Sequence, residues 1–193
     1  MEVLTAHDAL IIADVQNDFL LGGALGIFGA QEILPTLCQY IYRFQTRGLP
    51  IFLTRDWHPP AHCSFRDQGG PWPTHCVAGT AGSLPPPDFE APASAVLIFK
   101  AIDQDQEAYS AFQHTALNRH LHALGIRRLF IGGLATDYCV ANTVKDAMAL
   151  GYAVCLLMDG IKAVNIKPDD GRLAEQDMIR LGASPIRLEM LAT

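Results

Sequence analysis

Short apolar runs alternate along this chain with segments of helical periodicity, and this alternation constrains the fold more than any other feature. Between the runs, apolar residues recur at helical spacing, as at Ile33, Leu37 and Ile41. Near-continuous apolar strands joined by helices predict an α/β fold, a Rossmann-like three-layer α/β/α arrangement with a six-stranded, mainly parallel sheet. The expected strands are residues 9–15, 50–54, 95–99, 128–133, 153–158 and 185–188.

Composition narrows the class of protein. The chain has 193 residues, half of them hydrophobic, which favours one compact domain over residues 1–193. A net charge of -6 without a basic cluster argues against nucleic acid and against anionic membranes as partners. We also see no signal peptide and no apolar run near the roughly 20 residues that span a bilayer. Five cysteines without C-x-x-C spacing favour a reducing, cytoplasmic compartment, and a homo-oligomer is compatible with the sequence.

One long interval, residues 55–94, breaks the alternation. It is rich in proline, glycine and histidine, and it contains both tryptophans of the chain. Long loops inside compact domains are usually functional or disordered, and the tryptophans and histidines argue against disorder. We therefore expect a functional, metal-binding loop region here.

Three chemically versatile residues fall near the carboxyl ends of predicted strands, where parallel α/β sheets bind their ligands. Asp14 follows the first strand, Lys100 ends the third, and Cys139 lies between the fourth strand and a helix expected at residues 141–150. A carboxylate that takes the thiol proton, a cation that lowers the thiol pKa, and a sulfur that attacks would form a nucleophilic constellation. Each residue alone has a plainer interpretation, as a cap, a solvated strand end and a core cysteine.

A second constellation lies in the long loop. Asp56 and His58 are two residues apart, so in an extended segment their side chains project to the same side, and His75 could complete a facial set. Zinc, iron or manganese would suit such a mixed nitrogen and oxygen site, and the spacing does not choose among them. His62 is a further candidate, with a hydrogen-bonded loop histidine as the equal alternative.

Taken in order, these motifs resemble the isochorismatase-like hydrolase superfamily, and within it the nicotinamidase (pyrazinamidase) family. The resemblance spans residues 10–150, and the ordered set is far more specific than any one match. The matching strings are Asp14-Val15-Gln16-Asn17-Asp18-Phe19, Asp56-Trp57-His58-Pro59, Trp72-Pro73-Thr74-His75-Cys76, Lys100, Tyr109-Ser110-Ala111-Phe112 and Gly133-Leu134-Ala135-Thr136-Asp137-Tyr138-Cys139-Val140.

The resemblance implies a catalytic triad in which Cys139 is the nucleophile, Asp14 the general base and Lys100 the electrostatic partner. It also implies an oxyanion hole made by the amides of Ala135 and Cys139, with a cis peptide bond between Leu134 and Ala135. Alanine at position 101, where many members have glycine, is a departure that puts the local backbone in question but not the triad.

The resemblance further implies one divalent metal ion held by Asp56, His58 and His75, with zinc preferred and iron or manganese as alternatives. Its remaining ligands would be waters, and it would engage the pyridine nitrogen of nicotinamide. His62 does not have the spacing of an additional loop ligand and stays outside the set. The residues implied to contact the aromatic ring are Phe19, Trp72 and Tyr109.

The implied function is hydrolysis of nicotinamide to nicotinate and ammonia through a thioester, in the salvage of NAD breakdown products. Two alternatives stay open: an amidohydrolase for another small amide of the same superfamily, and a metal- or ligand-binding module with an inert thiol. A redox role for Cys139 with Cys63 or Cys76 is a weaker hypothesis.

Overall fold

The computed structural model describes residues 2–89 and 91–192. Its centre is a six-stranded sheet in the order β3-β2-β1-β4-β5-β6, with every neighbouring pair parallel. The predicted α/β fold is therefore confirmed, and the sheet is wholly parallel. The strands are β1 Asp8–Ala13, β2 Ile51–Asp56, β3 Val96–Lys100, β4 Arg128–Leu134, β5 Ala153–Lys162 and β6 Ser184–Ile186.

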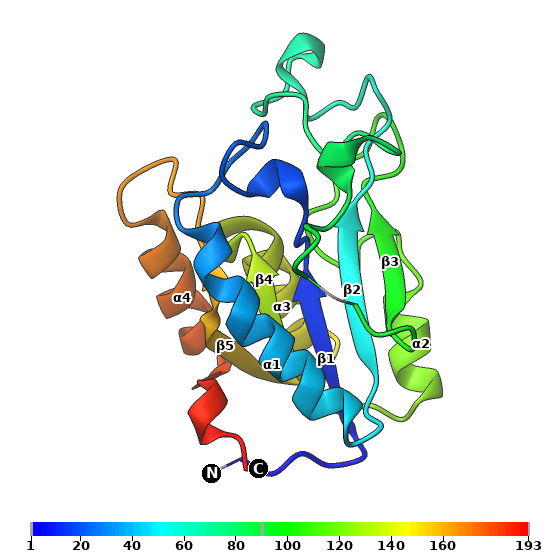
Figure 1. Cartoon of the computed structure of the whole chain (residues 1–193), viewed down its shortest axis with the longest axis vertical. Coiled ribbons are helices and arrows are strands. Elements are labelled where there is room, and N and C mark those ends of the chain that lie inside the picture. The colour runs from blue at the N-terminus through cyan, green and yellow to red at the C-terminus, as the bar shows by residue number, and fades with distance from the viewer. Residues whose placement is uncertain (1, 90, 193) are drawn as a thin grey trace.

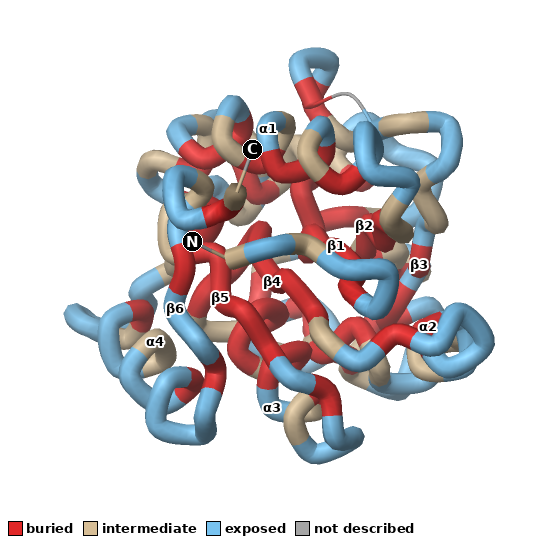
Figure 2. Tube along the Cα trace, turned by 90° about the horizontal axis from the view of Figure 1, so that it is seen from below, coloured by how far each residue is buried: buried red, intermediate tan, exposed pale blue. Residues whose placement is uncertain are grey.

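Helices cover both faces of the sheet and complete three layers (Figures 1 and 2). Alternate residues of β1 enter two separate cores: Leu10 and Ile12 pack in the cluster that contains α1, whereas Ile11 packs with the other three helices. This two-sided burial is why the strands are apolar at nearly every position. The helices are α1 Leu34–Gln45, α2 Leu117–Ala123, α3 Ala141–Ala149 and α4 Asp170–Leu181.

Strand β5 extends four residues beyond its predicted end at residue 158. The pairing of β4 with β5 is interrupted by an irregularity, after which Gly133 pairs with Ile161. Gly160 lies opposite Gly132, and a Cβ on Gly132 would come within 3.0 Å of the Gly160 carbonyl oxygen. This pair of glycines marks a close backbone approach inside a bulged strand.

The first part of the connection from β2 to β3 lies beyond the carboxyl ends of the strands, and the chain then returns to the amino end of β3 (Figure 1). Short 3₁₀ turns form at Arg66–Gln68 and Ala81–Ser83, and isolated bridges join His58 to Val77 and Phe65 to Trp72.

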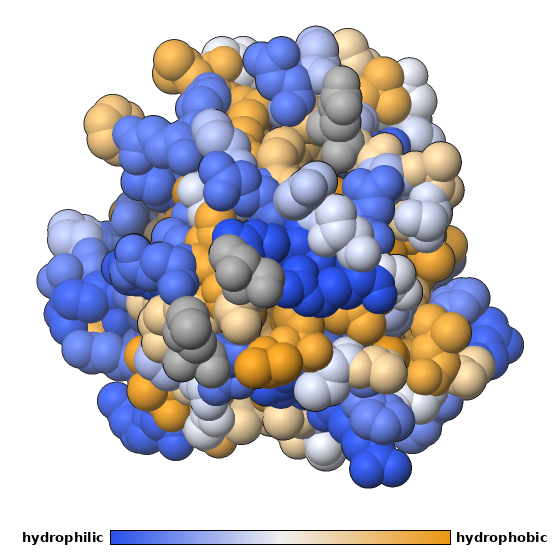
Figure 3. All heavy atoms as spheres, turned by 60° about the horizontal axis from the view of Figure 1, so that its bottom comes forward, coloured by the Kyte–Doolittle hydropathy of each residue, from blue (hydrophilic) through white to orange (hydrophobic). Residues whose placement is uncertain are grey.

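The opposite end of the molecule, at the amino ends of the strands, carries charged side chains. There Arg128 forms ion pairs with Asp8 and Glu2, and hydrophilic side chains gather near the middle of the view in Figure 3. No helix in the described part of the chain is long and apolar enough to cross a membrane.

Candidate active site

Asp14, Lys100 and Cys139 meet at the carboxyl end of the sheet. The Lys100 Nζ atom lies 3.0 Å from Asp14 Oδ2 and 3.4 Å from Cys139 Sγ. A side-chain hydrogen bond joins Cys139 to Asp14, whose Oδ1 atom also accepts a 2.6 Å hydrogen bond from Thr54 Oγ1. All three groups are buried. The structure thus places a thiol, a carboxyl group and an ammonium group within reach of one another.

The local backbone explains how these side chains converge. Asp14 follows β1 with a φ of 47°, a left-handed conformation that aspartate tolerates better than most residues. Lys100 is the last residue of β3 and pairs in register with Asp56 of β2, so their side chains project to the same face. Ala101, the departure from the family pattern, has a φ of 51° and so adopts the conformation that glycine favours.

Burial and the balance of charge set the protonation of this cluster. Burial lowers the pKa of the Lys100 ammonium, but the carboxylates of Asp14 and Asp56 outweigh it and hold that pKa well above its usual value. Burial raises the pKa of Asp14, and it also raises the pKa of Cys139 well above that of a free thiol. Lys100 lowers the pKa of the Cys139 thiol, as expected of the cation, but burial and the two nearby carboxylates exceed its effect.

Cys139 lies between β4 and α3, as expected. It belongs to a π-helical turn, Thr136–Val140, that precedes α3. The carbonyl of Ala135 accepts hydrogen bonds from the amides of Tyr138 and Val140, both at 3.1 Å. Single π-helical turns occur frequently at functional sites. The cis peptide bond expected between Leu134 and Ala135 is present.

Asp56, His58 and His75 form a compact set of candidate metal ligands, with one ligand atom from each within 4.8 Å of the others. Both ring nitrogens of His58 are buried and have no hydrogen-bond partner among the described residues. His75 Nδ1 lies 2.8 Å from the Pro73 carbonyl oxygen, which leaves Nε2 for a ligand. A carboxylate and two imidazoles with uncommitted nitrogens fit a divalent transition-metal ion.

His62 lies beside this set but has other partners. Its ring centroid is 4.3 Å from that of His58, yet Nδ1 lies 2.7 Å from Ser64 Oγ and Nε2 lies 3.1 Å from the Gln106 carbonyl oxygen. Because both nitrogens are engaged, His62 is a hydrogen-bonded loop residue in this structure.

A second group of potential ligands consists of Asp14, Asp56 and Cys139. The Lys100 ammonium contacts all three, and its remaining partner is the Ala108 carbonyl oxygen at 3.1 Å. A protonated lysine therefore occupies the position that a cation would need. This makes the first set the better candidate metal site.

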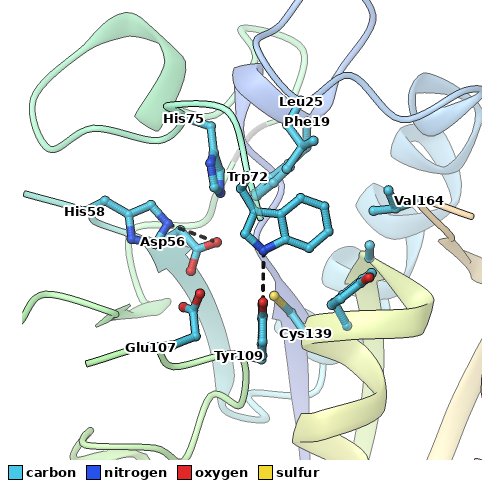
Figure 4. Close-up of a pocket in the computed structure, with 12 residues that line it drawn as sticks. Phe19, Leu25, Asp56, His58, Trp72, His75, Glu107, Tyr109, Cys139 and Val164 are labelled. Carbon is cyan, nitrogen blue, oxygen red and sulfur yellow. Dashed lines mark hydrogen bonds and ion pairs between the residues drawn. The ribbon is translucent and has the colours of Figure 1, made fainter. Parts of the chain in front are cut away.

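A narrow pocket opens beside the sulfur, between the candidate metal ligands and an aromatic wall (Figure 4). Phe19, Trp72 and Tyr109, the three predicted ring contacts, all line it. The Trp72 indole donates a 2.9 Å hydrogen bond to the Tyr109 hydroxyl. The Phe19 ring lies 5.6 Å from that of His75, so the aromatic and metal-binding sides of the pocket are contiguous.

Four further pocket residues were missed by sequence reasoning: Leu25, Glu107, Tyr138 and Val164. Tyr138 stands edge-on to Trp72 with ring centroids 4.8 Å apart, and its place directly before Cys139 was a usable signal. Glu107, two residues before Tyr109, directs its carboxylate toward Asp56 and His58 (Figure 4). Leu25 and Val164 come from loops far along the chain and carry no local signal.

No disulfide joins any two cysteines among the described residues. Cys76 is completely buried, and burial raises its pKa well above the usual value. The redox hypothesis gains no support from a thiol in this state.

The fold and the site together define a three-layer α/β protein of the hydrolase class. The isochorismatase domain family matches residues 8–189, so the chain belongs to the isochorismatase family.

Characterised relatives and solved structures agree with this assignment. The nicotinamidase of Escherichia coli is 36% identical over 197 residues, covering 91% of this chain and 92% of the relative. The zinc complex of a pyrazinamidase from Pyrococcus horikoshii has a TM-score of 0.91 at 42% identity, covering 94% of this chain and 99% of that one. The nicotinate complex of PnC1 from L. infantum has a TM-score of 0.91 at 34% identity, covering 99% and 98%.

Proposed function

We propose that this protein is a nicotinamidase that hydrolyses nicotinamide to nicotinate and ammonia. The observation that carries the proposal is the position of the Cys139 sulfur, in contact with Lys100 and Asp14, at the base of a pocket with aromatic walls and a candidate metal site. Relatives named nicotinamidase, at 34–36% identity over most of the chain, support the same substrate.

The proposed reaction begins with transfer of the Cys139 proton to Asp14, whose raised pKa suits a base that accepts a proton and later returns it. The sulfur attacks the carboxamide carbon, and the oxygen accepts hydrogen bonds from the amides of Ala135 and Cys139. Asp14 then gives its proton to the departing ammonia, and a thioester remains. Water, deprotonated by Asp14, cleaves the thioester to nicotinate and restores the thiol.

Lys100 keeps its charge throughout this cycle, because the carboxylates around it raise its pKa. Its ammonium balances the negative charge that moves between sulfur and carboxylate. We assign it an electrostatic role and no proton transfer.

The ring-binding part of the proposal rests on the other pocket residues. Phe19 and Trp72 would hold the pyridine ring, with Tyr109 fixing the Trp72 indole through its hydrogen bond. Asp56, His58 and His75 would hold one divalent ion, with zinc as the proposed metal. When bound, such an ion supplies a Lewis acid for a heterocyclic nitrogen. We place the activity in the salvage of NAD breakdown products in a reducing, cytoplasmic compartment, which five cysteines without C-x-x-C spacing support.

Ammonia and nicotinate release from nicotinamide tests this function. The zinc-loaded parent should release the two products in equal amounts, and Cys139→Ala should lose at least about a thousandfold in kcat. Cys155→Ala is the matched control, because that thiol is buried in the α1 core away from the pocket, and it should keep the parental rate. If the parent hydrolyses only a non-aromatic amide, such as a ureide, nicotinamide is not its substrate. If Cys139→Ala is still active, the proposed mechanism is wrong.

A further inference from the structure

The segment that follows Asp14 forms hydrogen bonds with the backbone on both sides of the candidate metal site. Gln16 is completely buried, and its side-chain amide is fully engaged. Its Oε1 atom accepts a hydrogen bond from the Asp56 amide at 2.9 Å, and its Nε2 atom donates to the Asp56 carbonyl at 2.8 Å. Nε2 also donates to the Ser83 carbonyl at 3.0 Å. One side chain thus holds the backbone of a candidate ligand by both its donor and its acceptor.

Two residues later, Asp18 makes the corresponding connection to His75. Its Oδ2 atom accepts a 2.7 Å hydrogen bond from the amide of Cys76, the residue next to that ligand. Its Oδ1 atom accepts a 3.2 Å hydrogen bond from Ala24, beside the pocket residue Leu25. Gly82 packs directly against the Asp18 carboxylate, and a Cβ at position 82 would collide with it.

The candidate ligands Asp56 and His75 are separated by a long loop, and the bridge between His58 and Val77 links their two segments at one point. Both segments are in addition tied to one short stretch that leaves the central strand β1. We propose that Gln16 and Asp18 are positioning residues that preorganise the metal site by holding its two ligand-bearing segments at a fixed separation. This inference rests on the metal site of the proposed function, but it does not depend on the substrate.

Zinc affinity measured without substrate tests this role. The full-length protein is stripped of metal, and its Kd for Zn²⁺ is determined by competition with a chromophoric chelator. Gln16→Met keeps the approximate volume but removes all three hydrogen bonds, and Asp18→Asn removes one of two acceptors. Each should weaken zinc binding by about 10- to 100-fold, the usual consequence of losing a group that orients ligands.

Two further variants separate positioning from general stability. Asn17→Ala is the matched control, because Asn17 lies between the two residues yet bonds through its side chain only to the Ala81 carbonyl; its zinc Kd should stay within twofold of the parent. Gly82→Ala leaves Asp18 in place but displaces its carboxylate, so it should reproduce the loss seen in Asp18→Asn. It also keeps the test decisive if Asp18→Asn does not fold.

The outcomes are distinguishable. Folded Gln16→Met and Gly82→Ala proteins that bind zinc within twofold of the parent would overturn the inference, even if their free energy of unfolding is reduced. Equal weakening in Asn17→Ala would also overturn it, because the effect would then belong to the whole segment. A parent that binds zinc tightly but releases no ammonia would remove the proposed substrate and leave this inference standing, whereas a parent that binds no zinc would remove both the site and the inference.

Discussion

Lys100 is the residue at which the two halves of the site meet. Its ammonium contacts Asp14 and Cys139 on one side and Asp56, a candidate metal ligand, on the other. Its side chain is only 1% exposed, so these partners take the place of water around the charge. Without the ammonium, two buried carboxylates would face each other with no neutralising group.

Replacement of Lys100 should therefore be costly for stability as well as activity. We expect Lys100→Met to lower the free energy of unfolding by about 3–5 kcal/mol, because it leaves buried charges unpaired. Lys162→Met is the control: Lys162 pairs with Glu32 at 2.7 Å, but the two side chains are 36% and 67% exposed, and it should cost about 1 kcal/mol or less. Urea denaturation measures the free energy of unfolding of both variants, and an equal loss in the two would contradict this account of Lys100.

His58 gives the metal-free protein a specific pH dependence. Burial lowers the pKa of His58 from 6.5 to about 4. Between these values the unfolded chain binds a proton that the folded chain excludes, so stability falls as the pH falls. From pH 7 to pH 4 this group should remove about 3 kcal/mol from the free energy of unfolding. His58→Asn should lack that contribution, and parallel pH profiles for parent and variant would refute the prediction.

The sequence predicted the positions of the clustered residues better than it predicted the pKa of the thiol. Asp14, Lys100 and Cys139 were predictable because parallel strands bring their carboxyl ends to one edge. The thiol pKa was not, because its direction depends on how many carboxylates surround the sulfur, and Asp56 faces Lys100 as well as the candidate metal. Glu107 was missed for a related reason: only the folded loop directs its carboxylate toward the pocket.

Among the elements, β1 and β4 approach each other closely at one glycine. Gly133 pairs with Ala13 and has a φ of 110°, and a Cβ there would collide with the backbone of Ala13. This close approach lies one residue before the Leu134–Ala135 peptide and six before Cys139. Glycine at position 133 therefore allows the strand that leads to Cys139 to pack against the strand that leads to Asp14.

Gly133→Ala should accordingly destabilise the fold by about 2–5 kcal/mol, the sum of a left-handed backbone penalty and overpacking. Gly48→Ala isolates the first effect, because Gly48 has a φ of 65° with nothing within 4 Å of the new methyl group. That variant should lose only about 1 kcal/mol. Thermal unfolding of both variants measures the difference, and a Gly133→Ala protein no less stable than Gly48→Ala would show that β1 and β4 can separate without cost.

Elements with strong periodicity were predictable, and the long connection was not. The apolar runs predicted all six strands, because a strand that is buried on both faces is apolar at nearly every position. Residues 55–94 could be predicted only as a functional loop, because their shape depends on partners outside the segment. Gln16 and Asp18 hold this connection from a distant part of the chain, and no local pattern reports such bonds.

For the molecule as a whole, we predict a single cooperative domain that is stabilised by its metal. Strand β1, the first in sequence, pairs with both β2 and β4, so neither half of the sheet is complete without it. At a zinc concentration 100 times Kd, mass action adds about 2.7 kcal/mol, or about 5–10 °C in Tm for a chain of this size. Scanning calorimetry should show one transition with and without zinc, and His75→Asn should abolish the shift. Two separate transitions would refute the single domain.

The pocket wall also contains a natural optical probe. The chain has two tryptophans: Trp72 faces the pocket (Figure 4), whereas Trp57 packs against Phe99 with ring centroids 4.9 Å apart and is not among the pocket residues. A compound that enters the pocket meets one indole and leaves the other as a constant background. Intrinsic fluorescence can therefore titrate occupancy directly, without a label and without turnover.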